Sequence, residues 1–380
     1  MLRRTRAQWY GAAGLGLIAL ALLFGSLGSA RSAQALSVLL VDDDGAQCPS
    51  ALYATISDAI AAADSGDTIV VCPGTYDATT VDKRVTLSGY TADLSTKLSK
   101  CSDTLNNPAD QTTKNSIVAG FYVAADFSTI KGFTVTAPES GINIPWGTDG
   151  VWVTRNVLQD NSIGVNLNGT MSLVDHNCIR NNNAGGSASG TGIYSDQGLK
   201  SATIANNMFV NNHDGAAITL LDFAALGSLD DVHVKKNTSS GDGDLISIAG
   251  STNSQIQGNT STGAIGSGIF IEQGTFGPNS LLEISNNTLT NGLDEGINVD
   301  DDALVNSTIK NNKTNGNATF GIDVHVGNTD NSIKNNDFRN GGSQNDCQDD
   351  SSGGGTAGTA NTWKNDKGKT AFPPGICKKK

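Results

Sequence analysis

Four titratable residues in the last third of the chain have the types and spacing that acid–base chemistry needs. Several segments share the pattern Gly-Ile-x-apolar-x, and aligning them places Glu272, Asp300 and His325 in one outward column and Asp323 in the column two residues earlier. Side chains on neighbouring strands lie ~5 Å apart and diagonal ones ~7 to 8 Å apart, so these groups could meet on one face. Two carboxylates at such separations suit glycoside hydrolysis, the crowded one acting as the acid. The alternative is an ordinary polar outer face, in which His325 and Asp300 form a surface ion pair.

Four further residues are candidates for substrate binding. Phe270 and Asn298 precede Asp323 in its column. Trp146 and Trp152 lie in a loop and the strand after it, where an exposed indole could stack on a sugar ring or instead cover the core.

A calcium site is a second hypothesis for the same region. Asp294, Asp300, Asp301 and Asp302 lie close together in the sequence. Calcium prefers several carboxylate and carbonyl oxygens from a flexible loop. The spacing is not that of an EF-hand, so the alternative is an acidic solvated turn.

These residues are carried by a repeat. From residue 130 to 340 an Ile or Val, two residues and then an Asn recur, and a Gly-Ile-x-apolar-x segment follows after a variable loop. The Asn occurs at Asn156, Asn177, Asn207, Asn237, Asn259, Asn287, Asn312 and Asn336. A period in the twenties with alternating apolar residues predicts an all-β solenoid, and a leucine-rich repeat is disfavoured because no regular Leu framework is present. We expect a parallel β-helix whose corner Asn is structural, since Asn tolerates the left-handed backbone conformation and can bond to the Asn one coil away.

Both open ends of a solenoid need covers. Leu52, Ile56, Ile60 and Ala63 follow helical spacing, which predicts a short N-terminal capping helix. The expected organisation is a cap with the first strands at 36–80, the β-helix at 81–345 and a C-terminal loop or cap at 346–380.

Six cysteines without any C-x-x-C spacing predict disulfides rather than a metal site. Pairs that would staple the two ends are Cys48 with Cys72 and Cys347 with Cys377. Cys101 with Cys178 is the remaining pair.

The N-terminus predicts export. Arg3, Arg4 and Arg6 precede an apolar stretch at 11–27 and a small-x-small pattern at 33–35, so residues 1–35 resemble a signal peptide. An uncleaved anchor is the alternative, although the stretch is shorter than the ~20 residues of a spanning helix. We expect a secreted or cell-envelope protein, monomeric and without membrane contact after cleavage.

The charge limits the partners. The chain carries −12 and residues 1–35 contribute four positive charges, so the remainder carries −16. Such a surface repels nucleic acid and anionic lipid, and it disfavours polyanionic sugars unless cations bridge the two. Neutral glycans and metal-bridged ligands remain open, and a polysaccharide or cell-surface glycan is the expected partner.

The segments YATISDAI at 53–60, SGDTI at 65–69 and CPGTY at 72–76 resemble the N-terminal signature of pectin-lyase-like right-handed β-helix proteins. With the Asn repeats, the resemblance covers about residues 38 to 345. It implies a right-handed parallel β-helix, in a family that includes polysaccharide lyases, glycoside hydrolases, adhesins and a periplasmic protein linked to copper-enzyme maturation.

The resemblance does not extend to a complete catalytic motif. The family's galacturonan hydrolases carry Asn-x-Asp, Asp-Asp, Gly-His-Gly and Arg-Ile-Lys, whereas this chain has only 298–300, Asp301, Asp302 and His325. No calcium-binding Asp group beside a basic residue, as in pectate lyases, is evident. Four His and three Met are too few for a copper pathway. We expect an exported protein that binds or cleaves polysaccharide, as a hydrolase or lyase. The alternative is a non-catalytic envelope, adhesion or structural protein.

Overall fold

The computed structural model describes residues 36–91, 101, 114–223 and 229–379. The expected signal peptide, residues 1–35, lies outside these residues. No helix within the described ranges is long and apolar enough to cross a membrane.

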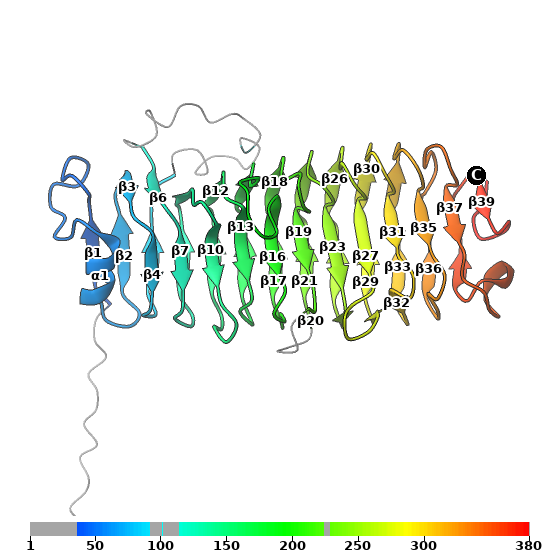
Figure 1. Ribbon diagram of the computed structural model, residues 1–380, viewed down its shortest axis with the longest axis horizontal. Coiled ribbons are helices and arrows are strands. Elements are labelled where there is room, and N and C mark those ends of the chain that lie inside the picture. Colours follow the sequence, from blue (N-terminus) through cyan, green and yellow to red (C-terminus); the bar gives the residue numbers. More distant parts are fainter. Residues whose placement is uncertain (1–35, 92–100, 102–113, 224–228, 380) are drawn as a thin grey trace, which may run out of the picture. The chain divides into compact units, whose positions relative to one another are not determined.

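The unit from Leu36 onward is a right-handed parallel β-helix whose coils stack along one axis (Figure 1). Each complete coil adds one strand to each of three parallel sheets. Sheet I has 13 strands: β1 (Val38–Val41), β2 (Thr68–Val71), β5 (Thr86–Ser88), β8 (Thr129–Lys131), β11 (Trp152–Thr154), β14 (Leu173–Asp175), β17 (Thr203–Ala205), β21 (His233–Lys235), β25 (Gln255–Gln257), β29 (Glu283–Ser285), β33 (Thr308–Lys310), β36 (Ser332–Lys334) and β38 (Thr362–Lys364). Sheet II has 12 strands: β4 (Thr79–Val81), β7 (Phe121–Val123), β10 (Ser140–Ile144), β13 (Ile163–Leu167), β16 (Thr191–Ser195), β19 (Ile218–Leu220), β23 (Ile246–Ala249), β27 (Ile269–Glu272), β31 (Ile297–Val299), β35 (Ile322–Val324), β37 (Cys347–Asp349) and β39 (Ala371–Phe372).

Sheet III has 10 strands: β3 (Gly74–Tyr76), β6 (Ser116–Val118), β9 (Thr134–Val135), β12 (Val157–Gln159), β15 (Cys178–Arg180), β18 (Met208–Val210), β22 (Thr238–Ser240), β26 (Thr260–Thr262), β30 (Thr288–Thr290) and β34 (Lys313–Asn315). A short fourth sheet joins β20 (Leu229–Asp230), β24 (Ser251–Thr252), β28 (Asn279–Ser280) and β32 (Leu304–Val305). The chain passes from sheet II to sheet I, turns a tight corner into sheet III and returns to sheet II through a loop of variable length.

The apolar alternation builds the core. Residues of sheet II expected to point inward, such as Ile142, Ile246 and Ile297, are fully buried and are stacked with the equivalent residues of the next coils. Because coils lie ~4.8 Å apart, each such column excludes water along the solenoid.

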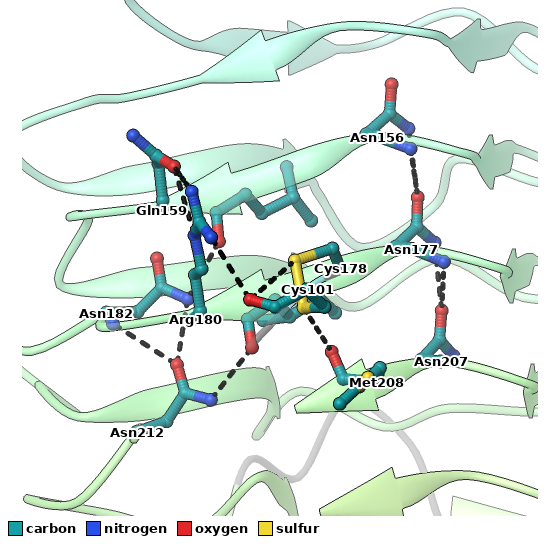
Figure 2. The surroundings of a disulfide bond; sticks show 12 residues. Cys101, Asn156, Gln159, Asn177, Cys178, Arg180, Asn182, Asn207, Met208 and Asn212 are labelled. Atoms are coloured by element: carbon teal, nitrogen blue, oxygen red, sulfur yellow. Dashed lines mark hydrogen bonds between the residues drawn. A yellow bond between two sulfur atoms is a disulfide. The ribbon is translucent and has the colours of Figure 1, made fainter. Parts of the chain in front are cut away.

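The predicted Asn residues form a continuous ladder at the corner between sheets I and III. Asn156 donates from its backbone N (2.9 Å) and Nδ2 (3.1 Å) to Oδ1 of Asn177, and this pattern repeats to Asn336, which donates to Asp366. A second ladder, Asn161, Asn182, Asn212 and Asp242, was not predicted. Figure 2 shows parts of both ladders on either side of β15.

One detail of the corner prediction is wrong. The left-handed conformation is adopted by the residue before the ladder Asn, for example Asn286, Asn311 and Asn335, with φ of 58°, 57° and 60°. The ladder Asn uses its own backbone N–H and amide to bond the next coil, so the preceding residue makes the turn.

The N-terminal cap is a helix, α1 (Ile56–Ala62), whose N-cap Thr55 accepts a hydrogen bond from the backbone N of Asp58. Ile56 and Ile60 are buried and α1 packs against β1, β2 and β4. Leu52 is 87% exposed, so its prediction as part of the apolar helix face is wrong, because the cap at Thr55 starts the helix after it.

The C-terminal segment contributes strands as well as a loop. β37, β38 and β39 continue sheets II and I beyond residue 345, and a 3-10 turn, η2 (Thr356–Gly358), lies between β37 and β38. The solenoid therefore runs to Phe372 at the end coloured red in Figure 1.

All three predicted disulfides are present: Cys48–Cys72, Cys101–Cys178 and Cys347–Cys377. Cys101 is fixed on the outer face of sheet III, where its carbonyl accepts a 3.0 Å hydrogen bond from Nη1 of Arg180 (Figure 2).

Candidate functional site

Strand register on sheet II places the predicted residues in two adjacent outward columns. Phe270, Asn298 and Asp323 are paired in register across β27, β31 and β35. Two residues further along, Glu272 ends β27, and Asp300 and His325 directly follow the ends of β31 and β35. The alternation of a β-strand therefore brings both sets to one face, as the aligned repeat predicted.

His325 lies at the centre of these groups. Its Nε2 is 3.4 Å from Oδ2 of Asp323, and its Nδ1 is 3.9 Å from Oδ1 of Asp300 and 3.6 Å from Oδ1 of Asp301. The path through the ring limits the separation of the Asp323 and Asp300 oxygens to roughly 9.5 Å, the upper end of the range for paired glycosidase carboxylates. The imidazole therefore links a buried carboxylate to two exposed ones.

Asp323 is the most perturbed member of the predicted set. Its side chain is only 9% exposed, and burial raises its pKa to about 6, with Asp350 and Glu295 acting in the same direction and His325 opposing them. Among the described residues, its Oδ1 and the Oδ1 of Asn298 on the adjacent strand are buried without a hydrogen-bond partner. Two such acceptors side by side favour a proton on Asp323.

Two more acids belong to this face but were not predicted as site residues. Glu295 is 8% exposed and accepts hydrogen bonds from Ser267 Oγ (2.9 Å) and Thr319 Oγ1 (3.1 Å). Burial raises its pKa. Burial also raises the pKa of Asp244 to about 7, and the charges of Glu272 and Glu295 add to this. Asp244 and Glu295 occupy the position two residues before the first inward residue of β23 and β31, so a third aligned column would have found them.

Glu272 lies one coil before Asp300 and is held by a short hydrogen bond from Ser247 Oγ on β23. We refer to Asp244, Glu272, Glu295, Asp300, Asp301, Asp323 and His325 as the acid–histidine cluster.

The calcium hypothesis is met by only part of its residue set. Oxygens of Asp300 and Asp301 and a nitrogen of His325 lie within 4.8 Å of one another and could hold a divalent ion. Asp302 instead packs against Gly327 in the next coil, and Asp294 accepts from Thr319 Oγ1 at 3.2 Å. The predicted four-carboxylate set is therefore not assembled.

The two predicted tryptophans lie away from the cluster. Trp146 follows β10, five strand spacings from β27, or roughly 24 Å. Trp152 is on sheet I, in a depression that Arg84 and Phe127 also line. Both indoles are about half exposed, at 51% and 53%. The sequence indicated a loop for Trp146 and a strand for Trp152, but it did not show that both lie far from the acid–histidine cluster.

The Asp323 column runs along the whole of sheet II. In strand order it reads Thr80, Tyr122, Asn143, Asn166, Tyr194, Thr219, Ser247, Phe270, Asn298, Asp323, Gln348 and Phe372. We call it the sheet II track. Near its start a depression of about 370 Å³ is lined by Thr80, Tyr122 and Asn143. Tyr122, Tyr194 and Phe270 recur every third coil, roughly 14 Å apart.

Family comparisons agree with this architecture. The family described as "Protein of unknown function (DUF1565)" matches residues 42–245, more than half of the chain. The chain belongs to the DUF1565 family. The family described as "Periplasmic copper-binding protein (NosD)" matches residues 224–372, which include the acid–histidine cluster. No curated protein sequence matches the chain.

Solved structures confirm the fold at low identity. The catalytic domain of a GH87 α-1,3-glucanase in complex with tetrasaccharides is 15% identical, with a TM-score of 0.52 over 79% of this chain and 59% of that chain. A mannuronic-acid-specific family 6 polysaccharide lyase from human gut microbiota is 15% identical, with a TM-score of 0.50 over 76% and 72%. A tailspike protein of E. coli bacteriophage HK620 in complex with a pentasaccharide is 11% identical, with a TM-score of 0.50 over 74% and 57%. The chain thus spans less than two thirds of the glucanase and tailspike chains. Its fold is the right-handed parallel β-helix that the resemblance to pectin-lyase-like proteins implied.

Copper in its reduced state is a poor fit to the described residues. Soft Cu(I) prefers thiolate and thioether ligands. Every described cysteine is in a disulfide, and Met171 and Met208 lie in the corner before β14 and on sheet III, away from His325.

Proposed function

We propose that this is an exported carbohydrate-active protein that binds a neutral polysaccharide along the sheet II track and hydrolyses it at Asp323. The observation that carries the proposal is the buried Asp323 carboxyl, with its pKa raised to about 6, facing His325 and the exposed Asp300 and Asp301. A buried acid whose pKa is raised to about 6, beside an exposed carboxyl group, is the kind of pair that glycoside hydrolysis uses.

In the proposed reaction Asp323 donates its proton to the glycosidic oxygen as the bond to the anomeric carbon breaks. Asp300 accepts a proton from the water that attacks that carbon. His325 lies between the two carboxylates and orients both. After each turnover Asp300 releases its extra proton to solvent and Asp323 takes one up, which restores the starting state.

The track supports binding of an extended chain. Aromatic faces at Tyr122, Tyr194 and Phe270 can stack on sugar rings, and the amides of Asn143 and Asn166 lie between the first two in register. The glucanase and tailspike structures with the same fold contain oligosaccharides.

Hydrolysis is favoured over lyase chemistry by charge. A lyase acts on a uronate, whose carboxylate must be neutralised by cations. The acid–histidine cluster contains six carboxyl groups and one histidine, and the exposed carboxyl groups of Asp300 and Asp301 would face the ligand, so a neutral sugar is the better fit.

The three disulfides support an extracytoplasmic location, because such bonds persist in oxidising compartments. The match to a family described as periplasmic agrees with this.

The test is a panel of neutral and acidic glycans, with and without calcium, measuring binding, new reducing ends and the ultraviolet absorbance of unsaturated products. The proposal predicts reducing ends without absorbance, lost in Asp323→Asn and retained in Asp330→Asn, an exposed acid on another face. Absorbance would indicate a lyase. Binding without cleavage by the unmodified protein would favour the non-catalytic adhesion function.

A further inference from the structure

A ridge of lysines follows the corner between sheets I and III in the last coils, away from sheet II. It consists of Lys310, Lys313, Lys334, Lys364, Lys367 and Lys378, and we call it the lysine ridge. On sheet I, Lys310, Lys334 and Lys364 stack in register. Across the corner, Lys313 pairs with Asp337, which is followed by Lys367 and Lys378 in the next positions. Two columns of positive charge therefore flank the Asn ladder.

The lysine ridge carries more positive charge than the neighbouring carboxylates neutralise. Lys310 is bound to Glu283, with Nζ 2.8 Å from Oε2, and Asp337 is bound to Arg339 at 2.6 Å. None of the other five ridge lysines lies within ion-pair distance of a described acid, although the charge of Lys334 acts on Glu283 and that of Lys367 on Asp337 at longer range. Lys313, Lys364, Lys367 and Lys378 are exposed. Like charges stacked in register at ~4.8 Å destabilise a sheet. In a chain of net charge −12, such stacking is more readily explained by an anion that binds there than by general solubility.

A hollow lies on the ridge and offers hydrogen-bond donors. It measures about 340 Å³ and is lined by Asn335, Asn365, Asp366, Lys367 and Lys378. The Asp366 carboxyl is buried and already accepts from Asn336 and from the backbone N of Lys364. The groups that the hollow offers to a ligand are therefore mainly the exposed amides and ammonium groups.

We propose that the lysine ridge is a binding site for a linear anionic polysaccharide, separate from the catalytic face. A chain with one carboxylate on each ring carries a regular row of negative charge and can follow the ridge without approaching the acidic sheet II. A flat anionic membrane would meet the negative remainder of the surface as well. The three disulfides agree with an oxidising, extracytoplasmic compartment, where anionic glycans of the cell surface can be reached. The ridge would hold the protein on an anionic matrix while sheet II faces away from it.

The experiment is calorimetric or interferometric titration of the purified protein with polygalacturonate, at low and at high salt. The matched control ligand is the fully methyl-esterified polymer, which has the same backbone without the charge. Duplex DNA and vesicles containing anionic phospholipid are tested in parallel. The variant is Lys334→Gln/Lys364→Gln/Lys367→Gln, and the control variant is Lys114→Gln/Lys200→Gln/Lys236→Gln, which removes the same charge from scattered exposed positions.

We expect polygalacturonate to bind, high salt to weaken it, and the ridge variant to lose about tenfold in affinity with a shallower salt dependence, while the control variant is unchanged. Thermal unfolding should be the same for both variants. Equal losses in the two variants, equal binding of the esterified polymer, stronger binding of DNA or vesicles, or no binding of polygalacturonate would each overturn the proposal. Because Asp323→Asn leaves the ridge intact, it should bind polygalacturonate normally, whatever its effect on hydrolysis.

Discussion

Asp323 combines two properties that a solvated surface carboxylate lacks, a buried oxygen without a partner and a pKa raised by its surroundings to about 6. The physical cause is mainly burial between Asn298 and Gln348, its neighbours in register. The same register leaves Asp300 and Asp301 exposed one column away. The same strands therefore hold one carboxyl group in a buried environment and two in an exposed one.

Replacing Asp323 by Asn should lower kcat by about 100-fold or more while binding is retained, because the amide cannot donate the required proton. Reducing-end kinetics with matched binding titrations check this. Asp330→Asn serves as the control, and a similar loss in that variant would mean that general charge and not the acid is responsible.

The pH dependence follows from the sign of the Asp323 shift. As general acid, Asp323 must be protonated, so activity should fall as pH rises through about 6. His325 lowers the pKa of Asp323 by its charge, so His325→Gln should move this limb to higher pH. A pH–rate profile of each protein gives the pH at which activity falls. If that pH is the same in His325→Gln as in the unmodified protein, His325 does not influence the pKa of Asp323.

The sequence predicted the site residues correctly where the alternation of a strand decides which face a side chain occupies. Phe270, Asn298 and Asp323 could be aligned because each lies one residue after an inward Ile. Asp244 and Glu295 lie at the junction of a variable loop and a strand, and their burial depends on partners such as Ser267 and Thr319 that spacing does not reveal.

At the scale of elements, the Asn ladder is what holds consecutive coils in register. Asn259 accepts from the backbone N and Nδ2 of Asn237 and donates to Val234 and Asn287. The pattern of recurring Asn was visible in the sequence. The second ladder follows the main one five residues later with the same spacing, so an alignment of that position would have shown it as well. Its last member, Asp242, and the last member of the main ladder, Asp366, have Asp where the pattern has Asn.

Asn259→Ala should lower the free energy of unfolding by about 2–4 kcal/mol, since it leaves several buried polar groups without partners. Chemical denaturation gives the value. Gln257→Ala removes an exposed amide from the same coil and should change it by no more than about 0.5 kcal/mol. Equal effects of the two changes would show that the ladder contributes nothing specific.

The end of the ladder should titrate. Burial raises the pKa of Asp366 to about 6, above the ordinary 3.8. A carboxyl with a raised folded-state pKa contributes stability that is fully present below the unfolded pKa and is lost as pH rises through the folded one. Between pH 4 and 6 the unmodified protein should therefore lose on the order of 2 kcal/mol relative to Asp366→Asn. Denaturation curves at several pH values test this, and parallel stability profiles would contradict it.

For the whole molecule, each solenoid coil contacts mainly its two neighbours, so the free energy of unfolding is approximately a sum of local contributions. The end coils have a neighbour on one side only, and we expect them to unfold first. The covers are α1 with Cys48–Cys72 at one end and Cys347–Cys377 at the other. The repeat and the cysteine positions predicted the architecture and all three disulfides. The extra C-terminal strands escaped prediction because β37 to β39 are short and lack the Gly-Ile pattern.

Removing the C-terminal disulfide with Cys347→Ser/Cys377→Ser should cost about 3–4 kcal/mol by the loop-closure relation for its 30-residue separation. Hydrogen exchange should show lost protection in β37 to β39 with central coils unchanged. Loss of protection throughout the solenoid would instead indicate one cooperative unit.

The most direct test of the central claim is a crystal structure of Asp323→Asn with an oligosaccharide of the glycan that the panel identifies. The account predicts sugar rings lying along the sheet II track, with a glycosidic oxygen next to residue 323 and a ring stacked near Phe270. An oligosaccharide bound on another face, with the acid–histidine cluster left in contact with solvent, would contradict it.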